Sequence, residues 1–385
     1  MRPDWDIFCA VIDNYGDIGV AWRLARTLAR EQGAAVRLWV DDLRAFQRLW
    51  PTADPEQPVQ QCAGVTVCAW RTPWADVNPA RAVIEAFGCA LPEPYLAAMA
   101  AQTPAPVWLN LEYLSAEDWV SHHHGLPSPH PRLPLTKHFF FPGFTPETGG
   151  VLIEADYAAR RAAFDETAWA GEMGLGARQQ NELRVSLFAY ENAALPALLD
   201  AWASGDRPVT CLVPEGRVLP QLAAWLGVSG LAAGAGHRRD ALTLRVIPFT
   251  DQDCYDQLLW ACDLNFVRGE DSCVRAQWAA RPMVWQAYPQ TGGAHWDKLE
   301  ALLACYLLAA TPDVTEAVSG LWRCWNGIPG ASNIARAWGG WLTHHEAITR
   351  HAQAWPRTLA RAGRLSVKLA EFVESTLKSR VFSNP

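Results

Sequence analysis

The sequence predicts an α/β protein made of two Rossmann-like domains that face each other across a cleft, followed by C-terminal helices. Its 385 residues exceed the size at which one hydrophobic core usually stops growing. Strand-like and helix-like segments alternate along the chain, which is typical of parallel strands joined by crossover helices. This alternation restarts in the second half and gives way to a mostly helical end, so we expect two domains and a helical tail.

The first half contains five short strand-like runs, with helical patterns over 18–30 and 94–101. The strand-like runs lie at 6–13, 35–40, 65–70, 83–89 and 107–112. A His- and Pro-rich stretch over 121–134 predicts an exposed loop, and 145–150 predicts a linker. The N-terminal domain is therefore predicted to span residues 1–150.

The second half repeats the pattern, and we expect the second domain to span 151–355. Its predicted strands lie at 184–190, 209–213, 242–248, 264–267 and 283–288, and its predicted helices at 193–202, 219–226, 253–262, 272–280 and 296–305. From 331 onward the pattern is helical, and Pro356 is expected to divide two helices because proline lacks a backbone N–H. Residues 356–385 are predicted to pack back on the N-terminal domain. Among enzymes, this organisation is that of GT-B glycosyltransferases and of some sugar-nucleotide epimerases.

Composition limits the classes of function. A formal net charge of -7 argues against nucleic-acid binding but leaves room for a protein partner with a basic patch. The N-terminus has no signal-peptide pattern and no apolar run reaches membrane-spanning length, so we expect a cytoplasmic protein without a membrane partner. Ten scattered cysteines form no C-x-x-C pair, which excludes a zinc ribbon and a thioredoxin-type motif.

The segment 13–19, Asp-Asn-Tyr-Gly-Asp-Ile-Gly, is the most informative motif. A strand, a glycine-containing turn and a helix start are typical of phosphate binding, yet this turn carries two carboxylates. We therefore expect a cationic or proton-donating second substrate there. Alternatively, Asp17 only caps the following helix. Asp13 is harder to explain in that way, because the carboxyl end of a parallel strand faces the ligand crevice. The spacing of Gly16 and Gly19 is not that of a dinucleotide fingerprint.

A second strand-to-helix turn lies at 266–272. Arg268 would contact a phosphate, and Asp271 or Ser272 would cap the helix, whose first N–H groups would hold a diphosphate. Glu270 does not suit a pure anion site, so something cationic is expected to approach it. The alternative is an ordinary capped turn.

Aromatic residues mark a third candidate. Phe188 and Tyr190 share one face of a predicted strand, where they would stack on a nucleobase or pack in the core. Gln252, Tyr255 and Tyr288 stand near comparable ends of strands or helices. We predict no metal site, because the histidines at 122–124 and 130 lie in the Pro-rich loop and no metal or P-loop motif is complete.

Taken together, the motifs at 13–19, 188–191 and 268–272 resemble those of the EarP-type protein-arginine rhamnosyltransferases. Pro248, Phe249, Gln252 and Tyr288 also agree, and the resemblance extends over essentially the whole chain. It implies a GT-B fold and an inverting, metal-independent transfer of L-rhamnose from dTDP-β-L-rhamnose, with no further cofactor. The implied acceptor is an arginine of bacterial translation elongation factor P, whose modification relieves ribosome stalling at polyproline stretches.

The resemblance also implies roles for single residues. The essential acids fall on Asp13, Asp17 and Glu270. Because a carboxylate must accept a proton from the guanidinium, we choose Asp17 as the base, with Asp13 shaping or charging the same pocket and Glu270 positioning donor or acceptor. The acceptor belongs on the N-terminal domain and dTDP on the C-terminal one. The donor-binding positions are Asn14, Tyr15, Gly16, Phe188, Tyr190, Gln252, Tyr255, Arg268, Glu270, Asp271, Ser272 and Tyr288.

Two other functions remain open from the sequence. One is a nucleotide-sugar epimerase or small-molecule glycosyltransferase, which would turn over donor without a protein acceptor. The other is a non-catalytic nucleotide-sugar-binding or scaffolding protein, in which the three acids would be replaceable.

Overall fold

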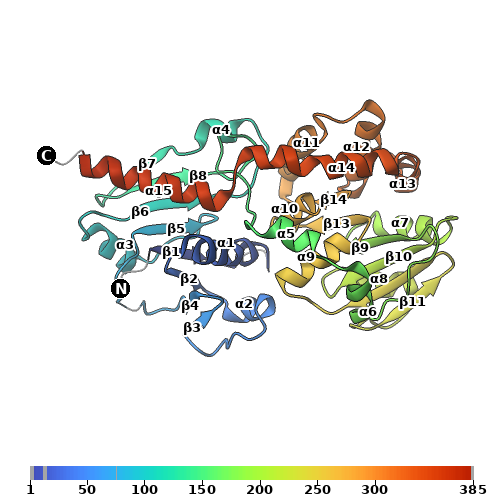
Figure 1. Cartoon of the computed structure of the whole chain (residues 1–385), viewed down its shortest axis with the longest axis horizontal. Coiled ribbons are helices and arrows are strands. Elements are labelled where there is room, and N and C mark those ends of the chain that lie inside the picture. Colours follow the sequence, from blue (N-terminus) through green and yellow to red (C-terminus); the bar gives the residue numbers. More distant parts are fainter. Residues whose placement is uncertain (1–3, 12–14, 75, 383–385) are drawn as a thin grey trace. The chain divides into compact units, whose positions relative to one another are not determined.

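The computed structural model describes residues 4–11, 15–74 and 76–382, and the chain divides into two compact units (Figure 1). The N-terminal unit comprises 1–157 together with 358–385, and the C-terminal unit comprises 158–357. The sequence suggested boundaries at 150 and 355.

An eight-stranded sheet forms the N-terminal unit, in the order β3-β4-β2-β1-β5-β6-β8-β7. Its strands are β1 (Trp5–Cys9), β2 (Val36–Val40), β3 (Val59–Cys62), β4 (Val65–Ala69), β5 (Ala82–Ala86), β6 (Val107–Leu111), β7 (Pro127–Pro129) and β8 (Thr136–Phe140). The six inner strands are parallel, whereas β3 and β7 pair antiparallel at the edges. Its helices are α1 (Gly16–Gln32), α2 (Leu43–Leu49), α3 (Glu93–Ala100), α4 (Trp119–His123), η2 (Ala360–Ala362) and α15 (Leu365–Phe382).

Aromatic packing fills one face of this sheet. Tyr95 and Met99 of α3 are fully buried against Phe8, Trp39 and Trp108 of the strands. The same strands present residues such as Ile7 on their other face, since side chains alternate along a strand. Burial on both faces explains why the central strands read as continuous apolar runs in the sequence.

The predicted loop over 121–134 is partly wrong, because α4 and β7 form within and beside it. Strand β7 is a Pro-Ser-Pro segment that pairs with β8 through its backbone while its proline side chains are exposed. A short edge strand of this kind contributes little to the core, so no hydrophobic alternation announces it.

The C-terminal unit contains a six-stranded sheet in the order β11-β12-β10-β9-β13-β14. Its strands are β9 (Leu183–Leu187), β10 (Val209–Pro214), β11 (Gly236–Arg239), β12 (Leu242–Ile247), β13 (Leu264–Arg268) and β14 (Met283–Gln286). All neighbouring pairs are parallel except β11 with β12. Its helices are α5 (Tyr157–Ala162), α6 (Glu166–Glu172), α7 (Leu195–Ala203), α8 (Leu219–Leu226), α9 (Gln252–Ala261), α10 (Asp271–Trp278), η1 (Thr291–Gly293), α11 (Ala294–Leu307), α12 (Pro312–Trp325), α13 (Ile334–Thr343) and α14 (His345–Leu359).

Helices cover both faces of the second sheet. On one face, Trp169 of α6 and Leu258 of α9 pack on Leu212 of β10. On the other, Phe266 of β13 lies against Trp202 of α7, with ring centroids 5.8 Å apart. The carboxyl ends of β9 and β13 are thereby fixed beside each other.

Pro356 does not divide two helices as expected, because α14 continues through it. A buried stripe compensates for the lost N–H bond: Ile348, Ala352, Trp355 and Leu359 are each no more than 5% exposed. The helical tail is interrupted instead at Gly363, whose φ of +85° favours glycine.

The C-terminal helix α15 belongs to the N-terminal unit. The Val151 N–H donates to the Gly363 carbonyl oxygen at 3.0 Å, and Lys368 Nζ donates to the carbonyl oxygens of Pro146 and Thr148 at 2.6 Å. Gly150 allows this close approach, because a Cβ there would lie 2.5 Å from the Gly363 oxygen. The last segment of the chain thus completes the first unit.

Candidate active site

The proposed donor residues of the C-terminal unit gather around the carboxyl ends of β9 and β13, whereas Tyr15 and Gly16 lie at the start of α1 in the N-terminal unit. The Phe188 N–H donates to the Phe266 carbonyl oxygen at 3.0 Å, which extends the pairing of the two strands by one residue. Beyond β9 follow Phe188 and Tyr190, and β13 ends at Arg268. Since parallel strands end at the same edge, their terminal side chains meet there.

Arg268 is the centre of this cluster. Its guanidinium carbon lies 4.4 Å from the ring centroid of Phe188 and 4.3 Å from that of Tyr190. The side chain is 7% exposed, and its Nε makes no hydrogen bond within the part of the chain that the structure describes. Arg268 therefore retains a donor group that suits a phosphate oxygen.

Two further aromatic contacts surround Arg268. The ring of Tyr288 meets that of Tyr190 edge-on, with centroids 5.4 Å apart, and is 50% exposed. The ring of Tyr255 on α9 meets that of Phe188 at 5.7 Å. Burial raises the pKa of Tyr255, so its phenol stays protonated and does not act as a base. The sequence-predicted aromatic residues are thus in mutual contact.

The turn between β13 and α10 leaves the amino end of the helix half-buried. Gly269 has a φ of +66°, and its carbonyl oxygen accepts a hydrogen bond from Trp285 Nε1 at 2.9 Å. Glu270 occupies the N-cap position without a side-chain cap bond. The expectation that Asp271 or Ser272 caps α10 is therefore wrong, because both lie inside its first turn.

Asp271 and Ser272 make other contacts. Gln252 Nε2 donates to Asp271 Oδ2 at 3.1 Å, and the Ser272 hydroxyl donates to the Arg268 carbonyl oxygen. The first N–H groups of an α-helix have no partner within the helix, and the helix dipole favours a negative charge near them. With Arg268 alongside, this turn can bind an anion such as a diphosphate.

In the N-terminal unit, Asp17 lies in the first turn of α1 and is 2% exposed. The hydroxyl of Tyr113, which follows β6, donates to Asp17 Oδ1 at 3.0 Å. Helix α1 begins at Gly16 and its N-cap is Tyr15, so the alternative that Asp17 is the N-cap residue is wrong. Asp13 and Asn14 lie outside the described residues.

The carboxylate of Asp17 also affects a neighbouring thiol. The pKa of Cys9 is raised, first by burial and then by the negative charge of Asp17. Cys9 is the last residue of β1, so Asp17 lies at the carboxyl edge of the first sheet. The two groups of candidate residues therefore occupy equivalent edges of two sheets.

Sequence reasoning missed three side chains that hold these groups in place. They are Tyr113, which binds Asp17; Trp285, which binds Gly269; and Gln286, whose Oε1 accepts the N–H of Tyr190 at 2.8 Å. Each lies within two residues of the carboxyl end of a strand, which is the signal that could have identified it.

Two general properties of the described residues bear on the site. No group of three or more His, Cys, Asp or Glu side chains is placed to hold a metal ion in residues 4–11, 15–74 and 76–382. Over the same ranges, no helix has both the length and the apolar character needed to cross a membrane.

Comparison with known proteins gives one family. A family model described as Elongation-Factor P (EF-P) rhamnosyltransferase EarP matches residues 5–374. The protein-arginine rhamnosyltransferase of Pseudomonas putida (strain KT2440) is 50% identical over 381 residues, which cover 98% of this chain and 100% of that protein.

Solved structures agree with this result. One that concerns EarP-mediated arginine glycosylation of translation elongation factor EF-P is 36% identical, with a TM-score of 0.69 over 97% of this chain and 99% of that one. A UDP-glucosyltransferase from Polygonum tinctorium, only 11% identical, covers 97% of this chain and 98% of its own with a TM-score of 0.50, and shows the fold alone.

Proposed function

Since this chain belongs to the EarP family of elongation factor P rhamnosyltransferases, we propose that it transfers L-rhamnose from dTDP-β-L-rhamnose to an arginine side chain of translation elongation factor P. The chain is a glycosyltransferase with a GT-B fold. The observation that carries the proposal is the 50% identity to a protein-arginine rhamnosyltransferase over 98% of the chain.

The C-terminal unit would bind the donor. Arg268 and the amino end of α10 offset the charge of the diphosphate, and the half-exposed ring of Tyr288 offers a face for the thymine base. Phe188 and Tyr190 already contact the guanidinium of Arg268, so they fix its position beside the donor. No metal is required in this scheme, because Arg268 and the helix dipole stabilise the leaving dTDP.

The N-terminal unit would act on the acceptor. A guanidinium is protonated and delocalised, which makes it a poor nucleophile until a carboxylate orients it and removes a proton. We assign this task to Asp17, propose that Asp13 shapes or charges the same pocket, and assign to Glu270 the positioning of a substrate. One guanidinium nitrogen attacks C1 of rhamnose, the C1–O bond breaks, its electron pair leaves with dTDP, and the nitrogen loses its proton to Asp17.

This chemistry predicts inversion at C1, because the nucleophile enters on the face opposite dTDP. The modified factor would relieve ribosome stalling at polyproline stretches. Because the acceptor is a translation factor, the proposed place of action is the cytoplasm.

A transfer assay tests the proposal. Purified chain, elongation factor P and dTDP-β-L-rhamnose are incubated with a chelator, and the acceptor is weighed intact by mass spectrometry. We expect the acceptor to gain one deoxyhexose, and an acceptor with the target arginine changed to lysine to gain none. An unchanged acceptor mass in the presence of folded chain would refute the proposal, and transfer of other dTDP-sugars at the same rate would refute the choice of donor.

A further inference from the structure

The C-terminal unit has a groove at the end of its sheet opposite to the proposed donor residues. Its volume is about 380 Å³, and it is lined by residues of the segment after α6 and of β9 to β12. Arg184 and Thr210 lie near the amino ends of β9 and β10, whereas Phe188 and Arg268 stand at carboxyl ends. This groove is therefore separate from the candidate active site.

Strand register places four polar side chains in one row along the groove. Arg184 of β9 is paired with Thr210 of β10, Thr210 with Thr243 of β12, and Thr243 with Arg238 of β11. Paired residues of neighbouring strands project from the same face of a sheet. All four line the groove, so it has a floor of two hydroxyls between two guanidiniums.

Arg245 adds a third guanidinium at the end of the groove beside the edge strand β11, which we call its outer end. It lies two residues after Thr243, on the same face of β12, and is paired with Gly236 of β11. A Cβ on Gly236 would lie 2.8 Å from Arg245 Nη1, so the missing side chain lets Arg245 lie over the edge strand.

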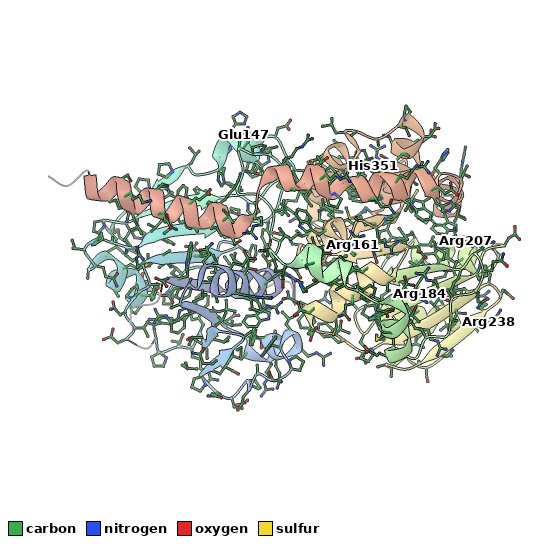
Figure 2. All side chains as sticks on the ribbon, in the orientation of Figure 1. Glu147, Arg161, Arg184, Arg207, Arg238 and His351 are labelled. Atoms are coloured by element: carbon green, nitrogen blue, oxygen red, sulfur yellow. The ribbon has the colours of Figure 1, made fainter. Side chains whose placement is uncertain are left out.

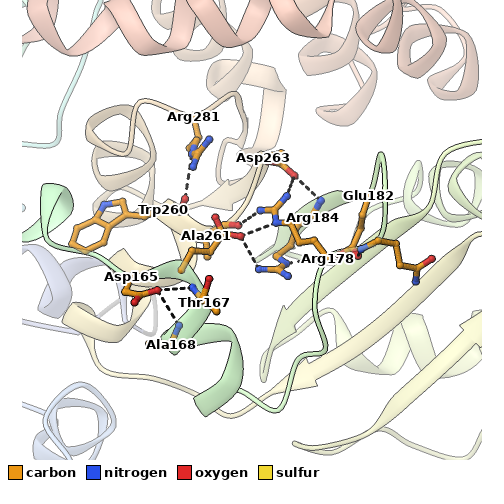
Figure 3. A network of polar contacts seen from close by, with 12 residues as sticks. Asp165, Thr167, Ala168, Arg178, Glu182, Arg184, Trp260, Ala261, Asp263 and Arg281 are labelled. Atoms are coloured by element: carbon orange, nitrogen blue, oxygen red, sulfur yellow. Dashed lines mark hydrogen bonds and ion pairs between the residues drawn. The ribbon is translucent and has the colours of Figure 1, made fainter.

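The inner end of the groove, around Arg184 of β9, is electrically balanced. Arg184 Nη1 lies 3.2 Å from Glu166 Oε1, which also binds Arg178 Nε at 2.7 Å. Figure 3 labels the two arginines, with Glu182 and Asp263. Glu182 lines the groove beside Arg184, with its Oε1 3.9 Å from Arg184 Nε. Asp263 in turn binds Arg178. These charges largely neutralise one another.

The outer end is not balanced. Neither Arg238 nor Arg245 makes an ion pair with any residue that the structure describes; Arg238 donates to the Asp240 carbonyl oxygen, at 3.3 Å. Figure 2 labels Arg238 on this unit, together with Arg184. Two uncompensated guanidiniums beside threonine hydroxyls form a donor set that matches phosphate oxygens.

We propose that this groove binds a small phosphate-bearing anion, with phosphate oxygens between Arg238 and Arg245 and further oxygens on Thr210 and Thr243. Its volume lies in the range of small-molecule pockets. The formal net charge of -7 does not oppose this, because binding depends on the local excess of guanidinium groups.

Calorimetric titration with inorganic pyrophosphate tests the proposal. We expect the groove of the full chain to bind one equivalent at low salt, besides the equivalent that the Arg268 turn can bind, and the double variant Arg238→Gln/Arg245→Gln to lose about 100-fold in affinity for the groove equivalent, roughly tenfold for each charged donor. Gly236→Ala keeps every charge but displaces the Arg245 guanidinium, and should weaken the same equivalent about tenfold. Unfolding midpoints close to that of the parent chain establish that the variants are folded.

Arg239→Gln is the matched control. Arg239 lies on the same strand with the same charge, but on the opposite face, 3.7 Å from Asp200 and over the ring of Trp225. Arg239→Gln should retain pyrophosphate binding within about threefold. Arg268→Gln should retain the equivalent bound in the groove, which the double variant loses. The proposal is overturned if the parent chain binds no pyrophosphate, if Arg239→Gln loses as much as the double variant, or if only Arg268→Gln abolishes binding.

Discussion

Asp17 is the residue at which the proposed chemistry can be tested most directly. Its carboxylate is buried and accepts a hydrogen bond from Tyr113, an environment that Asn can share without a change of shape. We expect Asp17→Asn to lower kcat of transfer by about 10²–10⁴-fold, because a neutral amide cannot accept the proton. Binding of dTDP should largely persist, since Phe188, Tyr190 and Arg268, the proposed contacts of the base and diphosphate, lie in the other unit. Transfer rates by intact mass and dTDP titration measure the two effects.

Tyr113→Phe is the control for this substitution. It removes one hydrogen bond to Asp17 but leaves the carboxylate, so a loss on the order of tenfold in kcat is expected. If Asp17→Asn were to lose dTDP binding and stability together, Asp17 would be a structural residue.

The sequence identified Asp17 from its place in the turn, but not Tyr113. Tyr113 lies 96 positions away in the sequence, and only the pairing of strands shows that the two residues meet.

At the scale of single elements, the β13-to-α10 turn depends on Gly269. Its φ of +66° is costly for a residue with a Cβ, so Gly269→Ala should cost about 1–2 kcal/mol of unfolding free energy. Gly269→Ala should also weaken dTDP binding, because the turn sets the positions of the first N–H groups of α10 and of the Arg268 side chain. Chemical unfolding and dTDP titration of the same sample separate these effects.

Gly227→Ala is a control with nearly the same backbone. Gly227 ends α8 with a φ of +71°, and a Cβ there would have nothing within 4 Å. It should lose similar stability while dTDP affinity stays unchanged. Equal losses of affinity in the two variants would show that the Gly269 turn has no special role in donor binding.

Most inner strands were predictable because burial on both faces gives long apolar runs, as in 107–112 for β6. The edge strands β3, β7 and β11 were missed, and so was the inner strand β8, most of whose residues are only half-buried. Strand β11 has the sequence Gly-His-Arg-Arg, which shows no hydrophobic alternation, and it pairs with β12 through backbone hydrogen bonds. An edge strand is held by backbone hydrogen bonds to its neighbour, and these leave no hydrophobic pattern in the sequence. The groove proposed above lies along one such strand, β11, so the sequence alone did not indicate it.

At the scale of the whole molecule, the N-terminal unit is assembled from both ends of the chain. Helix α15 buries Leu365, Leu369 and Val373, each no more than 7% exposed. Helicity after 331 was evident from the sequence, whereas the position of the break was not. Proline suggested it at 356, but buried side chains sustain α14 there, and the break falls at Gly363. Local propensity predicted a helix terminus where packing decided otherwise.

This arrangement predicts that α15 stabilises the unit that carries Asp17 without taking part in donor binding. Leu369 is fully buried, and Leu369→Ala should cost about 2–5 kcal/mol of unfolding free energy, through lost burial and the cavity left behind. Leu308→Ala, at a residue 87% exposed, should change stability by less than about 0.5 kcal/mol. Under native conditions Leu369→Ala should keep the dTDP affinity of the parent chain, because Arg268 and α10 belong to the C-terminal unit. Urea unfolding measures the change in unfolding free energy, and a separate titration of the native variant with dTDP measures its affinity. A loss of dTDP affinity in Leu369→Ala with unchanged stability would contradict this division of labour between the two units.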